Sequence, residues 1–361
     1  MAGFINPDPR FWLGKRVFLT GDSGFKGTWL ALWLRRLGAR VFGFSLPHAT
    51  RPNLSELVAL DTLIETWRGD IRDGAAVTAA MRGFAPDIVL HLAAQSMVRR
   101  SYREPVATFE TNVLGTVHVM EAASRTPSVR SVVIVTTDKC YENREWIWPY
   151  RETDALGGHD PYSASKACAE IAVAAWRRSF FQDGASIASA RAGNVIGGGD
   201  WAEDRLIPDC VRAMNAGATI PIRDPAATRP WQHVLEPLCG YLLLAERLWH
   251  DGAAAAEAWN FGPPMDDVQP VSGVADQVTA LWGDGASWRA DDGGHVHEAG
   301  LLAVDAAKAR ARIGWRPRLP LNEALAWTVG WYKAHRDGAD PATLIEHDLD
   351  AYEKPGVSRY G

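Results

Sequence analysis

The sequence has few cysteines, and their spacing argues against a disulfide scaffold or a zinc protein. Only four are present, with no C-x-x-C pair and no cysteine–histidine cluster at zinc spacing. We therefore predict free thiols in a reducing compartment and no metal site. The cysteines are Cys140, Cys168, Cys210 and Cys239.

Long apolar runs and an excess of basic residues are also missing. Residues 1–10 contain no apolar core after a basic start, as a secretory signal would. No apolar run approaches the ~20 residues that a membrane-spanning helix needs. The formal net charge is −5, whereas proteins that bind nucleic acid are usually basic. We predict a cytoplasmic protein with no nucleic-acid partner and no membrane partner, in which any bound anion is held by local groups.

The chain does have enough apolar residues for a large core, together with a regular alternation of strands and helices. Its 361 residues are 47% hydrophobic, which suits one large unit or two lobes. Residues 16–20 are predicted as a buried strand, 28–37 as a helix that ends before a glycine, and 40–44 as a second strand. Parallel strands joined by a helix form one βαβ unit. Trp29 and Trp33, two of 16 tryptophans, share one face of that helix and are expected to pack in the core.

The same alternation continues through the first half of the chain. Further strands are expected at 87–90, 131–136 and 186–190, and further helices at 106–123 and 162–181. Repeated βα units predict an α/β protein with a Rossmann-type, doubly wound parallel sheet.

Beyond the last of these strands, glycine, proline and tryptophan become frequent, which predicts a smaller C-terminal α/β lobe. We place the first domain at 1–192, with a returning segment at about 229–256 that includes a helix over 233–249. The second lobe then comprises 193–228 and 257–361. It is expected to cover the carboxyl edge of the sheet and to bind the substrate.

Three glycines follow the first strand and open the first helix. Gly21, Gly24 and Gly27 have G-x-x-G-x-x-G spacing. In this strand–turn–helix context the glycines permit a tight turn and leave room for a pyrophosphate at the helix N-terminus. A glycine-rich turn without a ligand is the alternative. The pattern predicts a dinucleotide-binding domain.

The second strand lacks the acid that usually binds the ribose 2′-hydroxyl of a dinucleotide. Ser45 stands near the expected place, with His48 and Arg51 beyond it. The residues alone therefore leave NAD and NADP open. Asp70, in the Gly-Asp-Ile-Arg-Asp stretch of 69–73, is a candidate contact for the adenine side or simply an exposed turn residue.

A tyrosine and a lysine lie one helical turn apart near the start of the helix over 162–181. Tyr162 and Lys166 are at i and i+4 and so share a face. A free tyrosine with a pKa of about 10 is a poor base at neutral pH, and a neighbouring ammonium and a nicotinamide cation stabilise its phenolate. The pair can then take a hydroxyl proton while hydride leaves for the cofactor. The spacing is common on helices and gains weight from the glycine turn and from the strand that ends at Thr136 and Thr137.

Taken together, these motifs resemble one family. The turn over 21–27, His91-Leu-Ala-Ala-Gln95, Thr137 and the tyrosine–lysine pair are similar to extended short-chain dehydrogenases/reductases that act on nucleotide sugars. The likeness runs to about Trp315. Five further stretches narrow it to the branch of that family that dehydrates CDP-glucose, namely 11–17, 98–102, 137–143, 191–201 and 229–233.

The resemblance implies a Rossmann-type fold, NAD as cofactor and CDP-glucose as substrate. It implies a redox-neutral cycle in which C4 of the glucosyl group is oxidised, water is lost across C5 and C6, and the hydride returns to C6. Tyr162 would be the base, Lys166 would tune it and bind the ribose, and Thr137 would hydrogen-bond the C4 oxygen. By the same resemblance the cofactor would contact Gly21, Gly24, Phe25, Gly27, Asp70, Ile71, Leu92, Ala93, Ala94, Tyr162 and Lys166.

Elimination of water needs a base for the C5 proton and an acid for the C6 hydroxyl. Asp138 and Lys139 follow Thr137 directly and are the predicted pair. The resemblance places a lysine at the second position in the CDP branch, where dTDP-sugar relatives carry glutamate. To act as a base Lys139 has to be neutral, which burial or a neighbouring positive charge promotes. Alternatively, Lys139 only neutralises Asp138, and another group takes the proton.

Substrate binding falls to the second lobe in this scheme. Arg229 resembles the arginine that binds the pyrophosphate, for which a planar guanidinium is suited, and Asn194 resembles the residue whose amide meets the phosphate region. Arg100 and Arg205 are further candidates, for which a solvated surface arginine is the alternative. Asp22 stands in the glycine turn where the resemblance leads us to expect a histidine.

Other interpretations stay open at this point. A nucleotide-sugar epimerase or reductase would need the tyrosine–lysine pair but not Asp138 and Lys139. A non-catalytic NAD-binding regulator is a second possibility, although it has no need of an intact Thr137. The helices over 104–123 and 162–181 have apolar faces that predict a homodimer with a four-helix interface, or else simple core packing.

Overall fold

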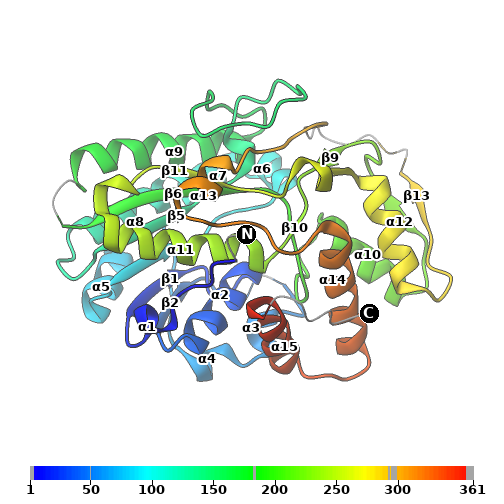
Figure 1. The fold of residues 1–361 in the computed structure, drawn as a ribbon, viewed down its shortest axis with the longest axis horizontal. Helices are drawn as coiled ribbons and strands as arrows, with labels where there is room; N and C mark the ends of the chain where they lie inside the picture. The colour runs from blue at the N-terminus through cyan, green and yellow to red at the C-terminus, as the bar shows by residue number, and fades with distance from the viewer. Residues whose placement is uncertain (1–3, 49, 182–183, 292, 294–298, 355–361) are drawn as a thin grey trace.

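The computed structural model describes residues 4–48, 50–181, 184–291, 293 and 299–354. At its centre lies one sheet of seven parallel strands in the order β11-β6-β5-β4-β1-β2-β3 (Figure 1). The strands run outward from β1 in both directions, which confirms the doubly wound, Rossmann-type arrangement predicted from the sequence. They are β1 (Arg16–Thr20), β2 (Arg40–Ser45), β3 (Glu65–Arg68), β4 (Ile88–His91), β5 (Ser131–Val135), β6 (Ser186–Ala192) and β11 (Ala258–Phe261).

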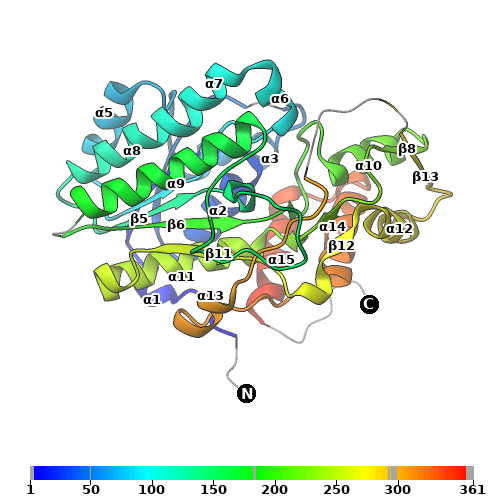
Figure 2. The same ribbon diagram turned by 90° about the horizontal axis from the view of Figure 1, so that it is seen from above.

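Helices cover both faces of this sheet, because successive residues of each strand point to opposite sides. In β1, Val17 and Leu19 pack into one hydrophobic core and Phe18 packs into another. The helices over the two cores are α2 (Phe25–Arg36) and α11 (Leu235–Asp251) on the first, and α5 (Gly74–Phe84), α8 (Gly115–Ser124) and α9 (Pro161–Ser179) on the second. Figure 2 shows α8 and α9 on one side of β5 and β6 and α11 on the other.

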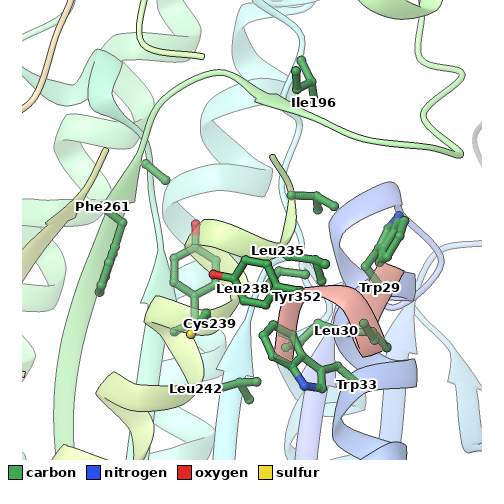
Figure 3. Packing of buried hydrophobic residues seen from close by; sticks show 14 of the residues in the cluster. Trp29, Leu30, Trp33, Ile196, Leu235, Leu238, Cys239, Leu242, Phe261 and Tyr352 are labelled. Atoms are coloured by element: carbon green, nitrogen blue, oxygen red, sulfur yellow. The ribbon is translucent and has the colours of Figure 1, made fainter. Parts of the chain in front are cut away.

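The first core is built largely from aromatic and leucine side chains, which Figure 3 shows between α2, α11 and the C-terminal helix α15 (Pro341–Glu353). Trp29 and Trp33 are fully buried there, as the sequence analysis predicted. Their ring nitrogens donate to Gly198 O and to Glu353 Oε1, each at 2.9 Å. Each tryptophan therefore fills the core and also ties a distant segment of the chain to α2.

The helix predicted before β5 is not regular. A π-helical turn, η1 (Glu110–Leu114), joins α7 (Pro105–Phe109) to α8. Within this wider turn lies the buried Asn112, whose amide donates to Gln95 O and Ser165 Oγ, both at 2.9 Å. Single π-turns are often found at functional sites. The hydrophobic period of the sequence does not register one inserted residue, so the analysis predicted one continuous helix.

A smaller lobe lies to the right of the sheet in Figure 1. In the described part of the chain it contains three two-stranded sheets, β7-β10, β9-β12 and β8-β13. Their strands are β7 (Val195–Ile196), β8 (Ile220–Ile222), β9 (Thr228–Arg229), β10 (Gln232–His233), β12 (Gln269–Pro270) and β13 (Trp288–Ala290). The helices of this lobe are α10 (Leu206–Asn215), α12 (Val271–Trp282) and α14 (Leu321–Arg336).

Two segments differ from the predicted boundaries between the lobes. β11 falls within the 257–361 range predicted for the second lobe but pairs with β6 as an edge strand of the main sheet. α15 falls in the same range and packs against α2, where Arg36 forms ion pairs with Glu346 at 2.7 Å and Glu353 at 3.0 Å. A four-residue strand and one more helix carry too little local signal to show which lobe they join. α11 does lie against β5 and β6, as expected of the returning segment.

Short helical segments complete the described chain. None of the described helices is long and apolar enough to cross a membrane, and no group of metal-ligating side chains gathers among the described residues. The short segments are α1 (Pro9–Trp12), α3 (Leu54–Leu57), α4 (Leu60–Leu63), α6 (Val98–Arg103), η2 (Asp138–Cys140), η3 (Gly252–Ala254), η4 (Met265–Asp267) and α13 (Ala307–Arg312).

Candidate active site

The glycine turn joins β1 to α2 and is packed so tightly that side chains do not fit. Gly21 has a φ of 80°, a left-handed conformation that favours glycine. A Cβ atom on Gly21 would lie 2.8 Å from Ala93 N, and one on Gly27 would collide with Gly21 O. Gly24 caps α2 with no side-chain hydrogen bond, and the helix begins at Phe25, three residues earlier than predicted. The first N–H groups of α2 thus remain available to a ligand, and the cradle fits a pyrophosphate.

The loop after β4 forms the wall next to this turn. Thr20 Oγ1 accepts hydrogen bonds from Leu92 N and Ala93 N, each at 3.1 Å, and lies 2.7 Å from His91 Nδ1. Burial lowers the pKa of His91 to about 3, so this ring is neutral and serves to hold the loop. Leu92 and Ala93 are therefore fixed against the glycine turn, and Ala94 follows them along the same loop.

Two further predicted cofactor residues follow β3. The carboxylate of Asp70 accepts hydrogen bonds from the side chain of Arg72 at 2.9 and 2.6 Å, and this contact lowers the pKa of Asp70. Ile71 is buried in the second core. Asp70 is thus a partly exposed turn residue whose carboxylate is already held in one orientation.

Asp22, which departs from the histidine expected in the turn, is fully buried. Burial raises the pKa of its carboxyl, and the charge of Arg68 opposes that rise. The sequence analysis missed Arg68, because its contact with Asp22 depends on the pairing of β2 with β3. The signal that could have indicated Arg68 was a basic residue at the end of β3, close to the glycine turn.

The predicted catalytic residues converge where β5 ends and α9 begins. Thr137 and Asp138 are buried, and Thr137 Oγ1 donates to Asp138 Oδ1 at 3.1 Å. Tyr162, on the first turn of α9, is only 7% exposed, and the neighbouring Thr137 hydroxyl lowers its pKa against the effect of burial. Lys166 lies one turn further along α9, and its Nζ donates to Val135 O at 3.2 Å. The strand end and the helix thus bring together the threonine, the acid and the tyrosine–lysine pair.

Burial controls the titration of this group. It raises the pKa of Tyr162 to about 12, against the hydrogen bond with Thr137 and the charge of Arg205, which lower it. It lowers the pKa of Lys166 to about 8, against the charge of Glu170. The tyrosine therefore needs further positive charge close by before it serves as a base near neutral pH, and a bound nicotinamide cation has that charge.

Asp138 has the properties of a general acid. Its Oδ2 is buried and has no hydrogen-bond partner among the described residues. Burial raises the pKa of the carboxyl, while the charges of Lys139 and Arg229 lower it. A Cβ on Gly193 would come within 2.9 Å of Asp138 Oδ2, so the glycine leaves space at that oxygen. A buried carboxyl with a raised pKa and an oxygen that no hydrogen bond occupies is suited to donate to a leaving hydroxyl.

Lys26 is a functional candidate that the sequence analysis missed. It lies in the first turn of α2, and its Nζ is 5.8 Å from the ring centroid of Tyr241. Burial lowers the pKa of Lys26 to about 7, with a further contribution from the charge of Arg205, while the charge of Asp138 raises it. Its position inside the glycine motif was the signal that marked it.

Of the four predicted substrate residues, two lie where their charges act on the catalytic residues. Arg229 on β9 is buried, and its Nη1 donates to Thr228 O at 3.0 Å. Arg205 donates to Asp200 Oδ2 at 2.8 Å, and its charge reaches Tyr162. Both arginines therefore act on the catalytic group.

The other two predicted substrate residues lie differently. Asn194 is half-buried beside β10, where its carbonyl accepts from Gln232 N at 3.0 Å. Arg100 is instead paired with Glu104 on an exposed face of α6, at 2.9 Å, which matches the solvated-arginine alternative.

Two further arginines, which the sequence analysis missed, share one carboxylate. Arg99 Nη1 and Arg223 Nη1 both donate to Asp204 Oδ1, at 2.9 and 3.0 Å. They come from α6 and from the segment after β8, which are far apart in sequence. Only the packing of the second lobe against α6 brings them together, so no local pattern marks them.

A buried polar network underlies the catalytic residues, and the sequence analysis missed it too. Glu170 on α9 forms an ion pair with Arg191 on β6 at 2.7 Å and accepts from Ser189 Oγ at 2.7 Å. Thr136, at the end of β5, donates to the other carboxylate oxygen of Glu170. Arg191 also donates to Tyr141 OH at 2.8 Å. The network therefore fixes the end of β5 directly before Thr137.

A glycine cradle on a Rossmann-type sheet, beside a buried tyrosine and lysine, defines the site of an NAD-dependent enzyme of the short-chain dehydrogenase/reductase type. The chain belongs to the NAD dependent epimerase/dehydratase family, whose sequence model matches residues 17–261.

Several proteins of similar sequence are nucleotide-sugar dehydratases. A CDP-glucose 4,6-dehydratase from Salmonella typhimurium is 49% identical over 351 residues, which cover 96% of this chain and 98% of that protein. A dTDP-glucose 4,6-dehydratase from Streptomyces griseus is 31% identical, with 76% of this chain and 79% of that protein covered. The structure of a dTDP-glucose 4,6-dehydratase from Streptomyces venezuelae with NAD bound superposes with a TM-score of 0.74. It is 28% identical and covers 91% of this chain and 99% of its own.

Proposed function

We propose that the chain is a CDP-glucose 4,6-dehydratase, which converts CDP-D-glucose to CDP-4-keto-6-deoxy-D-glucose and water. The observation that carries the proposal is the buried Asp138, followed by Lys139 and placed beside Thr137 and Tyr162. An epimerase or a simple reductase has no use for an acid and a base at this position. The 49% identity with the Salmonella dehydratase supports the same conclusion.

Bound NAD would supply the hydride acceptor for C4 of the glucosyl group and the hydride donor for C6. Gly21, Gly24 and Gly27 hold its pyrophosphate at the N-terminus of α2. Leu92 and Ala93 line the other side of the same turn.

The first proton transfer falls to Tyr162. Its phenolate takes the proton of the C4 hydroxyl, and Thr137 holds the C4 oxygen by a hydrogen bond. Lys166 contributes positive charge that favours the phenolate. The resulting 4-keto group makes the C5 proton acidic, which prepares the elimination.

Asp138 and Lys139 carry the elimination. Lys139 takes the C5 proton, the C6–O bond breaks, and Asp138 donates a proton to the departing hydroxyl, which leaves as water. When hydride arrives at C6, the proton on Lys139 returns to C5. Asp138 then regains a proton from solvent and Tyr162 gives its proton up, so the residues end the cycle as they began.

Charged groups of the second lobe hold the nucleotide. Arg229 binds the pyrophosphate, since its guanidinium is planar and suited to phosphate oxygens. Arg205 and Asn194 would add contacts, and Asp200 keeps the Arg205 side chain in place.

The direct test is to incubate the protein with NAD and a set of glucosyl nucleotides that carry cytosine, thymine, guanine or uracil. We expect CDP-glucose to give a product lighter by one water in mass spectrometry. The Asp138→Asn variant should lose that product and keep its affinity for NAD. CDP-galactose as the sole product would contradict the dehydratase proposal in favour of an epimerase.

We also propose that the protein is a homodimer. Large apolar side chains on α7, on η1, on α9 and at the residue that follows α9 are between 37% and 70% exposed, which is unusual for helices of a monomer. These helices lie on one outer side of the sheet (Figure 2). Two copies related by a two-fold axis bury such a face against itself. The side chains are Val106, Phe109, Leu114, Ile171 and Phe180.

Light scattering tests the dimer. Ile171→Glu should give a monomer at micromolar concentration, because it places a charge in the middle of the shared face. Ile147→Glu is the matched control, since Ile147 is also exposed but lies in the loop before α9 and on none of these helices. A monomeric wild-type protein would contradict the proposal.

A further inference from the structure

The end of β2 lacks the acid that usually binds the adenosine ribose, and the structure fills that place differently. Ser45 is the last residue of β2, and its register partner on β3 is Arg68. A guanidinium at this place is what enzymes use to accept the 2′-phosphate of NADP. The strand pairing alone would therefore favour the wrong cofactor for this family.

We propose that Asp22 and Asp61 make this chain select NAD against NADP, because together they neutralise Arg68 at the position of the adenosine 2′-hydroxyl. The inference rests on the proposed binding of the dinucleotide over the glycine turn. It assigns the choice between a 2′-hydroxyl and a 2′-phosphate to residues outside β2.

The contacts of Arg68 leave it little capacity for another anion. Its Nη1 donates to Asp22 Oδ2 at 2.8 Å and to Ser45 Oγ at 2.6 Å. Its Nη2 donates to Asp61 Oδ1. One guanidinium thus faces two carboxylates, which outweigh its single positive charge when both are ionised. A 2′-phosphate at this place would meet like charge, which is repulsive.

The chain provides a dedicated place for the carboxylate of Asp22. A Cβ atom on Gly43, in β2, would lie 2.6 Å from Asp22 Oδ2. Gly43 therefore leaves room for the carboxylate over the strand. Asp22 Oδ1 is buried there and has no hydrogen-bond partner among the described residues. An acid held so deeply does not bind the ribose itself, so its effect passes through Arg68, and Asp22 is a positioning residue.

The two acids differ in a way that makes the proposal testable. Asp22 is fully buried, whereas the side chain of Asp61 is 50% exposed. Asp22→Asn removes the buried charge with almost no change of shape. Asp61→Asn removes the outer charge at a site where a substitution leaves the core intact. If the buried variant fails to fold, the exposed one still reports on the same guanidinium.

The experiment is a titration of the full chain with NADH and with NADPH. Binding is monitored by energy transfer from the protein's tryptophans to the reduced nicotinamide. The quantity of interest is the ratio of the two dissociation constants, which does not depend on turnover. We expect the wild type to prefer NADH and Asp22→Asn to reduce that preference about tenfold. Asp61→Asn should reduce it by a smaller factor, because its charge is better screened by solvent.

Glu65→Gln is the matched control. Glu65 lies on β3, the strand of Arg68, and its substitution removes one negative charge, as the two aspartate variants do. Its ion-pair partner, however, is Arg40 at 3.0 Å. Its ratio should equal that of the wild type. Equal ratios for all four proteins, or a wild type that prefers NADPH, would overturn the proposal. A wild type that binds neither dinucleotide would overturn the proposed function with it, and is distinguished from the other outcomes by the absence of any energy transfer.

Discussion

Two glutamates are buried on opposite faces of the main sheet, and the chain holds them in different ways. Glu170, on α9, lies against Arg191, whose charge and hydrogen bond keep the pKa of the glutamate below its usual value although burial raises it. Two hydroxyl groups, of Thr136 and Ser189, supply further hydrogen bonds. This carboxylate therefore stays charged at every pH at which the enzyme works.

Glu236, on α11, has no such ion pair with any residue that the structure describes. Its Oε1 accepts from the backbone N–H groups of Arg318 and Leu319 at 2.7 and 2.8 Å, and its Oε2 accepts from Tyr352 OH at 2.8 Å. Burial raises its pKa to about 7, against the pull of these donors. The glutamate joins α11 to the C-terminal part of the chain.

The comparison separates two tasks. Under the catalytic residues an ion pair fixes the geometry and makes it insensitive to pH. At the junction with the C-terminal helices a neutral or charged carboxyl is tolerated, so the attachment of those helices varies with pH. We therefore expect mutations in the scaffold under the catalytic residues to have the largest effects, and mutations at the outer contacts of the site to have the smallest.

The largest effect is expected from Arg191→Met, which leaves Glu170 charged and unpaired. Both side chains are nearly inaccessible, at 4% and 2%, so we expect a loss of about 5 kcal/mol in the free energy of unfolding, at the upper end for a broken buried pair. Urea denaturation measures it. The double variant with Glu170→Gln should recover part of the loss. A single variant within about 1 kcal/mol of wild type would show that the pair does not hold the site.

Tyr162→Phe should separate chemistry from scaffold. It removes the base and leaves the Glu170–Arg191 pair intact, so we expect kcat to fall about a thousandfold, or about 4 kcal/mol. The melting temperature and the affinity for NADH should stay close to those of the wild type. Stopped-flow absorbance of the reduced nicotinamide reports the first hydride transfer. Unchanged turnover would refute the catalytic assignment and favour a non-catalytic NAD-binding protein.

The pH dependence of stability distinguishes the two glutamates directly. The folded protein keeps the proton of Glu236 up to a pH of about 7, whereas the unfolded chain releases it near 4.5. Stability therefore falls as pH rises between these values. Relative to Glu236→Gln, the wild type should lose on the order of 2–3 kcal/mol from pH 4.5 to pH 8.

Glu170→Gln is the control for that measurement. The pKa of Glu170 is lowered in the folded protein, so its contribution is present above the unfolded pKa and is lost only as pH falls through the folded one. Its difference from wild type should stay constant between pH 6 and pH 8. If the difference in the free energy of unfolding from wild type changed with pH in the same way for both variants, the contrast between the two glutamates would be wrong.

The sequence predicted those parts of the molecule whose signal is local. The strand 131–136, rich in β-branched residues, and the glycines of the turn mark their own structure, so the sheet and the cradle were predicted correctly. The tyrosine–lysine pair lies on one helix and needs no distant partner to be recognised. A resemblance to a known family supplied the rest of the predicted chemistry.

Apart from Lys26, the missed features depend on contacts between distant segments. Arg68 meets Asp22 across 46 positions of the sequence, and that contact follows from strand register. Arg191 meets Glu170 only when β6 packs against α9. β11 is four residues long and is recognisable as a strand only beside β6. Local composition and hydrophobic periodicity do not predict such pairings, because the pairings form only when distant segments pack together.

The smallest effect is expected on the substrate side, where Arg229→Lys keeps the charge but loses the planar fork. We expect KM for CDP-glucose to rise about tenfold, the size of one lost charge-assisted hydrogen bond, with kcat changed little. Arg100→Lys is the matched control, because Arg100 is half-exposed and pairs with Glu104. If Arg229→Lys lowered kcat as strongly as KM rose, the planar guanidinium would serve the elimination as well as the binding of the pyrophosphate. Substrate binding by Arg229 and the chemistry at Asp138 would then not be separable by mutation. The contrast between a rigid catalytic scaffold and more tolerant outer contacts, drawn from Glu170 and Glu236, would not extend to the substrate side.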